Sequence, residues 1–390
     1  MSPAAVQEGP TPPSITLWTI IRQFWADVYG KEVQSSNTYS YTWVADQAGH
    51  LFIGTVLVNL AQYVLAWFGV SQGLSLAFGL GLAVAGVATW EYSAYSSGVR
   101  AASNIFPLDK GLLAGNAVIA TAYMTMGAIA GYGFHLQEPW NLYIFSAITL
   151  LAIACAPWWL RQKIIWQKAG LPYLFRLADV PAGTRIEGTS ELQAFVDEPV
   201  PPLARPQQVI VGGPIGSGRT PVAAGIGTEF AFKNASVRYL GLHNLLEFAA
   251  EAPGSPFGDD PGPANINYWP WRTAQIVIID DVGPFIGVPA EDDAANIERF
   301  KRLLNRLEPL AAALAKCHTV WVVGDLDPAS NQASGPFLND LAREIGKFCG
   351  ATGQVLVVEL SEPQTEPSAT RPFRPFGFSA RRALVRKIDL

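Results

Sequence analysis

The hydrophobic positions divide the chain into two parts with different patterns. Long apolar segments fall at roughly residues 50–70, 75–95, 112–133 and 141–160, each bounded by turn or charged residues. A hydrocarbon core of about 30 Å needs about 20 apolar residues in a helix, and soluble helices are rarely apolar on all sides four times in succession. We therefore expect a four-helix transmembrane domain over residues 49–160.

Lysine and arginine predict the orientation of these helices. Basic residues lie before the first segment, between the second and third, and after the fourth, whereas residues 71–73 and 135–140 contain none. By the positive-inside rule both termini should face the cytoplasm. Residues 1–14 lack the pattern of a secretory signal, so we expect a multi-pass protein of the inner (cytoplasmic) membrane that inserts through its internal helices.

An amphipathic pattern precedes the first span, within an N-terminal cytoplasmic segment that we assign to residues 1–48. Its apolar positions are Leu17, Trp18, Ile20, Ile21, Phe24, Trp25 and Val28. This spacing predicts either a helix lying in the membrane interface or a helix packed on the soluble domain.

Polar residues also fall in or beside the predicted spans: Asp46, His50, Glu91, Asp109 and Asn116. In the predicted orientation they all lie at the cytoplasmic end of the bundle, where buried polar groups need a reason. They could bind a metal or a lipid headgroup, but we favour interhelical hydrogen bonds that fix the bundle. Their arrangement over about residues 46–132 resembles VanZ-like small membrane proteins, a resemblance that implies a site but no reaction.

The rest of the chain has the pattern of an α/β domain. Apolar, β-branched runs recur at residues 208–211, 275–281, 319–325 and 355–359, and most of them end in acidic residues. Such runs are typical of parallel strands buried on both faces, and ligands of open parallel sheets bind at the carboxyl ends of the strands. We expect an α/β domain, a parallel sheet flanked by helices, over residues 207–361.

Two flanking segments complete the expected organisation. Residues 161–206 form a linker that begins with basic residues and ends Pro-rich, and residues 362–390 form a basic tail rich in proline and phenylalanine. The tail could dock on anionic lipid or on a neighbouring subunit, or have no fixed structure.

A glycine-rich loop follows the first of these strands. Its residues are Gly213, Pro214, Ile215, Gly216, Ser217, Gly218, Arg219 and Thr220. They match the Walker A pattern G-x4-G-K-[ST] at every fixed position except Arg219, which replaces lysine. Backbone N–H groups of such a loop and the following helix N-terminus bind phosphate, and Thr220 can ligate Mg²⁺. The sequence therefore predicts ATP or GTP with Mg²⁺ as ligands.

Acidic residues at the ends of two later strands complete the predicted site. Asp280 is placed to hold Mg²⁺ through water, and Asp281 is the candidate catalytic residue that orients the attacking water. Asp325 takes the sensor position at the end of the next strand.

The run from Gly213 through residues 236–240 to residues 245–247 resembles the AAA+ helicase-loader ATPases of the DnaC and IstB type, over about residues 208–330. The resemblance implies that residues 207–361 form an AAA+-like P-loop NTPase domain with its nucleotide site. Two departures predict weak or absent hydrolysis: the forked guanidinium of Arg219 cannot simply replace a compact ammonium, and Asp325 adds negative charge near the γ-phosphate. An arginine finger would come from a neighbouring subunit, with Arg302, Arg306 and Arg343 as candidates.

Composition excludes some function classes. A formal net charge of -5 gives no bulk attraction to nucleic acid, and three cysteines without paired spacing do not predict a disulfide framework or a zinc site. We expect a membrane-anchored nucleotide-binding protein that assembles or switches a membrane complex, as a homo-oligomer or with other subunits. The alternatives are a hydrolysis-deficient P-loop scaffold and a membrane enzyme or transport module acting at the polar cluster.

Overall fold

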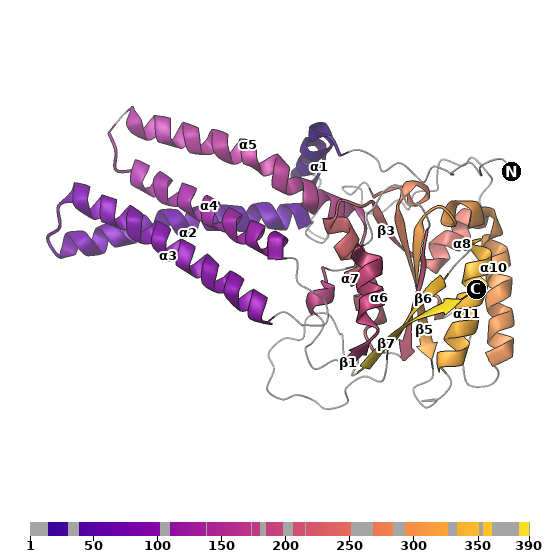
Figure 1. Cartoon of the computed structure of the whole chain (residues 1–390). Coiled ribbons are helices and arrows are strands. Elements are labelled where there is room, and N and C mark those ends of the chain that lie inside the picture. The colour runs from indigo at the N-terminus through magenta and orange to yellow at the C-terminus, as the bar shows by residue number, and fades with distance from the viewer. Residues whose placement is uncertain are drawn as a thin grey trace, which may run out of the picture. The chain divides into compact units, whose positions relative to one another are not determined.

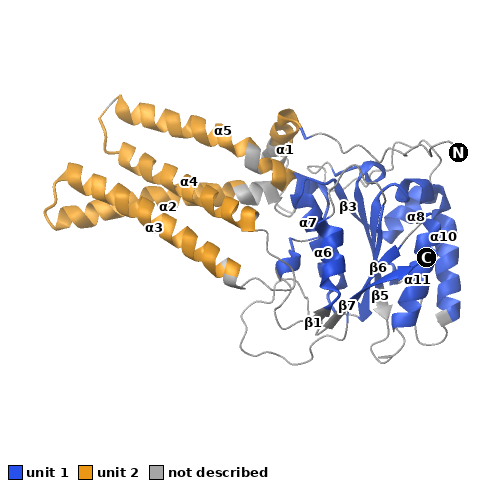
Figure 2. Ribbon diagram, viewed as in Figure 1, with its two compact units in different colours: residues 1–15, 103–106, 165–390 blue, residues 16–102, 107–164 orange. Residues whose placement is uncertain are grey.

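The computed structural model describes most of the chain, in two compact units (Figures 1 and 2). The membrane unit holds residues 16–102 and 107–164, and the α/β unit holds residues 165–390 with two short segments. The residues described are 15–29, 39–101, 110–137, 139–172, 174–179, 185–197, 206–214, 216–250, 268–283, 293–326, 334–350, 354–360 and 382–389.

The membrane unit is helical. Its elements are α1 (Leu17–Tyr29), α2 (Tyr39–Trp67), α3 (Gln72–Ala101), α4 (Lys110–Gly133) and α5 (Trp140–Lys168). Within the described residues, α2 to α5 are each long and apolar enough to cross a membrane, which confirms the four predicted spans. The amphipathic segment is also helical, as α1, and it packs against α2.

The fourth apolar helix extends beyond the predicted span. The basic residues 161–168, which we assigned to the linker, form the last two turns of α5. No glycine or proline interrupts the chain between Leu160 and Gly170, and Gly170 ends the helix with a positive φ of 67°, a conformation that suits glycine. The fourth membrane helix therefore continues directly into the start of the α/β unit.

Glycines hold α2 and α4 together. A Cβ atom on Gly127 would lie 2.0 Å from the carbonyl oxygen of Leu51, and one on Gly54 would lie 1.9 Å from that of Met124. The hydroxyl of Thr55 donates to the carbonyl oxygen of Gly127 at 2.9 Å. Small residues that let backbones approach, with a hydroxyl bonding across the contact, are typical of packing between membrane helices.

The α/β unit is built on a seven-stranded sheet, among the residues described, in the order β1-β7-β6-β2-β5-β4-β3. The strands are β1 (Arg185–Glu187), β2 (Gln208–Pro214), β3 (Val237–Gly241), β4 (Ile276–Asp280), β5 (His318–Leu326), β6 (Gln354–Leu360) and β7 (Arg382–Asp389). β6, β2, β5, β4 and β3 are parallel, which confirms the expected parallel sheet. β7 runs antiparallel to β6, and β1 is parallel to β7.

Helices cover both faces of this sheet (Figure 1). One core cluster joins the sheet to α6 (Thr189–Asp197), α7 (Arg219–Phe232) and the 3-10 turn η1 (Leu177–Asp179). The other joins it to α8 (Leu242–Ala250), α10 (Asp293–Leu314) and α11 (Ser334–Phe348). The second 3-10 turn, η2 (Trp271–Thr273), contributes Trp271 to this second cluster.

The two segments that flank the predicted NTPase domain also contribute elements to this fold. The predicted linker supplies η1, β1 and α6, and its Phe175, Leu192 and Phe195 are buried in the first core cluster. The predicted tail supplies β7, where Val385 is buried and Arg386 pairs with Glu359 of β6. Residues 362–381 of the tail lie outside the described residues.

Candidate functional site

The loop between β2 and α7 has the backbone geometry of an anion site. Gly216 and Gly218 adopt positive φ values of 78° and 97°, which glycine reaches without a Cβ penalty. α7 begins at Arg219 and has 14 residues, so its N-terminal N–H groups and dipole are directed at the loop. Ile215 lies outside the described residues.

Ser217, in the middle of this loop, is fully buried. Its hydroxyl oxygen has no hydrogen-bond partner among the described residues. Buried polar groups in native proteins nearly always have a partner, and an orphaned hydroxyl beside a helix N-terminus is a donor available to an anion. The sequence predicted Ser217 as part of the nucleotide-binding loop, although the Walker A pattern leaves its position free.

Arg219 is turned back towards the sheet. Its Nη1 donates to the carbonyl oxygens of Gly213 at 2.9 Å and of Val323, on β5, at 3.2 Å. These bonds tie the start of α7 to the ends of β2 and β5. The guanidinium therefore fixes the loop backbone in addition to supplying positive charge.

Asp280 is the centre of a closed hydrogen-bond network. This carboxylate is only 5% exposed at the end of β4. Its Oδ2 accepts from the Thr220 hydroxyl at 2.9 Å and from the Tyr239 hydroxyl, and its Oδ1 accepts from the Asp281 backbone N–H at 2.7 Å. The structure thus brings together the two residues predicted to hold Mg²⁺, one from α7 and one from β4.

Tyr239 is the part of this network that we did not predict. It lies on β3, whose last residue Gly241 is in register with Asp280. Its own backbone N–H donates at 2.8 Å to the carbonyl oxygen of Ala169, the residue directly after α5. A tyrosine two residues before a strand end is no motif, and only the β3–β4 register could have identified it.

The other predicted site residues are placed differently. Asp281 follows β4 with its side chain exposed and a positive φ of 58°, an uncommon conformation for a residue other than glycine. Asp325 lies near the carboxyl end of β5, between β2 and β4, but its side chain lies outside the described residues. The finger candidates Arg302, Arg306 and Arg343 are exposed on α10 and α11, and Arg343 pairs with Asp340.

The polar residues of the membrane unit do not form one cluster among the described side chains. Asp46 and His50 are joined through Gln47, whose Nε2 donates to Asp46 at 3.1 Å and whose Oε1 accepts from His50 at 3.2 Å. Glu91 lies on α3 and Asn116 is exposed on α4, while Asp109 lies outside the described residues. A bond that we did not predict joins helix α2 to the segment after α4: His135 Nε2 donates to Asn59 Oδ1 at 2.8 Å.

No metal site is found in the part of the chain that the structure describes. No group of three or more histidine, cysteine, aspartate or glutamate residues there could hold an ion. The cysteines are free, and burial raises the pKa of Cys349 to about 12, so its thiolate form is disfavoured.

Comparison with known proteins gives no family: no protein-family model matches the chain, and no curated protein matches it at a significant level.

Proposed function

We propose that this chain is a membrane-anchored, AAA+-like P-loop protein that binds ATP or GTP with Mg²⁺ and uses the bound nucleotide to switch or assemble a membrane complex. The supporting observation is the hydrogen bond from the Thr220 hydroxyl to Asp280. It brings a hydroxyl from the first turn of α7 and a buried carboxylate together at the carboxyl end of β4.

The donor set fits a magnesium–phosphate ligand. Mg²⁺ prefers oxygen ligands and usually keeps several waters, with substrate phosphates completing its shell. Thr220 would ligate the ion and Asp280 would hold it through water, while the loop N–H groups and Ser217 would bind phosphate oxygens. The bound ion would neutralise phosphate charge, and Asp281 would orient water from its exposed position.

Arg219 supports binding more than turnover. Its Nη1 is bonded to two backbone carbonyls, so reaching a γ-phosphate would mean giving up or sharing those bonds. A forked guanidinium also matches phosphate geometry differently from a compact ammonium. We propose that nucleotide binding, and not rapid hydrolysis, sets the state of the protein.

The test is nucleotide binding by the full chain in lipid nanodiscs, measured by titration calorimetry with ATP and with GTP, each with and without Mg²⁺. We expect Mg²⁺-dependent binding that Thr220→Ala weakens by about tenfold, the lower end of the cost of disturbing a metal shell. Thr228→Ala is the matched control, because Thr228 lies on the same helix and donates to Ala224, away from the loop. Absence of binding at millimolar nucleotide, with the protein monodisperse, would overturn the proposal.

Phosphate release measured on the same samples separates binding from turnover. We expect slow release that Asp281→Asn abolishes without changing affinity, and faster release from Arg219→Lys. Fast release by the unaltered chain would contradict the role given to Arg219.

A second candidate function is a scaffold whose P-loop fold supports assembly without nucleotide. The bonds of Arg219 favour it, because they tie the start of α7 to the carbonyl oxygens of Gly213 in β2 and Val323 in β5 without any ligand. It predicts that the oligomeric mass of the solubilised protein is the same with and without nucleotide, whereas the switch predicts a change.

A further inference from the structure

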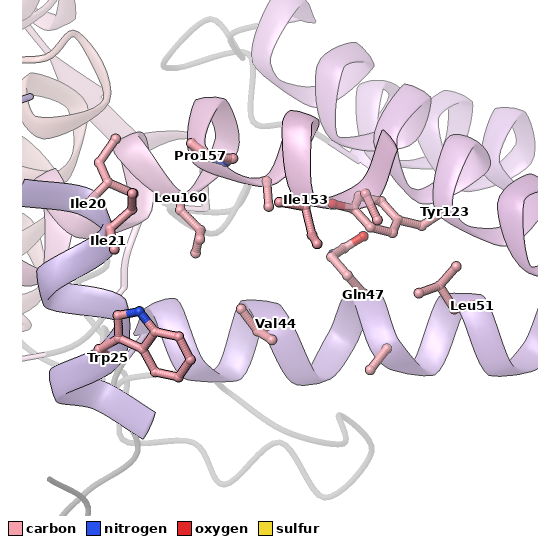
Figure 3. A pocket seen from close by; sticks show the side chains of 13 residues that line it. Ile20, Ile21, Trp25, Val44, Gln47, Leu51, Tyr123, Ile153, Pro157 and Leu160 are labelled. Atoms are coloured by element: carbon pink, nitrogen blue, oxygen red, sulfur yellow. The ribbon is translucent and has the colours of Figure 1, made fainter. Parts of the chain in front are cut away.

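The membrane unit contains an apolar pocket of about 350 Å³ between helices α1, α2, α4 and α5 (Figure 3). This volume lies within the range of about 300–1,000 Å³ that is usual for small-molecule sites. Every lining residue belongs to the membrane unit, so the pocket is independent of the nucleotide site.

The side chains that line the pocket are mostly hydrocarbon and offer few polar atoms to a ligand. α1 contributes Ile20, Ile21 and Trp25, and α5 contributes small and branched apolar side chains from Ala152 to Leu160. Gln47 extends from α2 towards Tyr123 in Figure 3, but its amide is already bonded to Asp46 and His50. Tyr123 is also partnered. Because a buried water needs two to four polar partners, an apolar ligand suits this pocket better than water.

The position of the pocket along the helices indicates which apolar ligand can reach it. It lies beside the first turns of the α2 span and the later turns of α5, on helices that are long and apolar enough to cross a membrane. An acyl chain is the apolar group that surrounds such helices on every side. Its flexible, unbranched shape also suits a pocket bordered by small residues such as Ala48, Ala152 and Ala156.

Two arginines directly follow lining residues of the pocket along the chain. Arg22 directly follows the lining residue Ile21 on α1, and Arg161 directly follows Leu160 on α5. Both side chains are exposed, and arginine matches the geometry of phosphate through bidentate hydrogen bonds. Positive charge at the border of an acyl-sized pocket complements an anionic headgroup.

We propose that this pocket binds one acyl chain of an anionic phospholipid, whose phosphate is held by Arg22 and Arg161. The bound lipid then fills the space between α1 and the α2–α5 pair and fastens α1 to the bundle. Trp25 and Leu160 close over the chain near the headgroup, and Leu51 and Tyr123 border its far end.

The test uses the full chain in nanodiscs that contain phosphatidylglycerol carrying a diazirine in its acyl chain. After photolysis, peptide mass spectrometry locates the labelled residues. We expect labels concentrated on the lining residues of α2 and α5. Ala156→Phe should reduce this labelling by about tenfold, because exclusion of two methylene groups costs about that much affinity.

Ala154→Phe is the matched control, since Ala154 is exposed on the same helix and does not line the pocket; it should leave the labelling unchanged. Ala152→Phe is a second filling variant in case Ala156→Phe does not fold. Arg22→Gln and Arg161→Gln should each reduce labelling about fivefold, and labelled phosphatidylcholine should give weak labelling throughout.

Two results would overturn the proposal. Labels spread evenly over pocket residues and exposed residues such as Leu82 of α3, unchanged by Ala156→Phe, would mean that lipid contacts the helices without occupying a site. Equal labelling by the anionic and the zwitterionic lipid, insensitive to both arginine variants, would remove the headgroup contact.

Discussion

The two units are both rich in apolar side chains but place them oppositely. In the α/β unit, strand residues such as Val209, Ile278 and Val320 are completely buried. In the membrane unit, Phe52, Leu82 and Leu150 are 69%, 59% and 67% exposed. Water drives burial in the first case, whereas acyl chains are as apolar as leucine, so the second unit must be held by close backbone packing. Burial therefore stabilises one unit and backbone proximity the other.

The largest effect should come from a side chain placed between α2 and α4. Gly127→Leu would put a Cβ 2.0 Å from the Leu51 carbonyl oxygen, so the helices must separate. We expect a loss above about 4 kcal/mol, in the range reserved for severe core disruption, seen as aggregation or loss of a thermal transition in detergent. Gly86→Leu on α3 is the control, because nothing lies within 4 Å of its added Cβ. An equal loss of stability in Gly127→Leu and Gly86→Leu would show that close backbone packing does not hold the membrane unit together.

The second largest effect should come from removing a buried side chain in the α/β unit. Leu338→Ala removes a completely buried side chain that packs over Gly212, and it should cost about 2–5 kcal/mol. Leu150→Ala removes a side chain that is 67% exposed on α5 and should change stability by less than about 0.5 kcal/mol. Thermal unfolding followed by tryptophan fluorescence measures both. An equal cost at Leu150 would mean that this surface packs against protein instead of lipid.

A buried histidine gives the α/β unit a stability that depends on pH. His318 is 0% exposed between Phe195 and Phe230, and its Nδ1 accepts from the Gln207 N–H at 2.9 Å. Burial lowers the pKa of His318 from 6.5 to about 4. The unfolded chain therefore takes up the proton first, so stability is complete above pH 6.5 and falls as pH drops from 6.5 to 4.

The size of this pH effect follows from the shift. Below pH 4 the loss in the free energy of unfolding is about 3 kcal/mol, since one pKa unit corresponds to about 1.4 kcal/mol. The measurement compares the melting temperatures of the unaltered chain and of His318→Gln at pH 7.5, 6, 5 and 4. The difference gives the contribution of His318, because glutamine keeps an acceptor but does not titrate. Parallel pH curves for the two proteins would show that His318 carries no such effect.

The sequence predicted the elements whose patterns are local. Four apolar runs and the β-branched strands were identified because burial on all sides leaves a continuous apolar signal. Thr220 and Asp280 were singled out because the pattern expected of a phosphate-binding loop fixes glycine and hydroxyl at set spacings, and because Asp280 ends a predicted strand. Their hydrogen bond in the structure places them as neighbours.

What was missed depends on contacts between distant segments. β7 follows a Pro-rich stretch and mixes charges with apolar residues, and only its pairing with β6 makes it a strand. The role of Tyr239 depends on the β3–β4 register, and the pocket of the membrane unit depends on how four helices pack. Local propensity does not carry such information.

The smallest effect concerns Tyr239 of the α/β unit. Tyr239 links Asp280 to Ala169, the residue that follows α5. Tyr239→Phe removes a donor from a buried carboxylate and should cost about 1.5 kcal/mol, the low end for a hydrogen bond to a charged group. If Mg²⁺ and nucleotide bind at Asp280, the ligand shell of the ion supplies new partners to the carboxylate. The stability cost of Tyr239→Phe should then be smaller when Mg²⁺ and ATP are present. Melting temperatures of the unaltered chain and the variant, each with and without Mg²⁺ and ATP, measure this. A difference that stays constant would separate Tyr239 from the proposed site and leave it as a packing residue of the sheet.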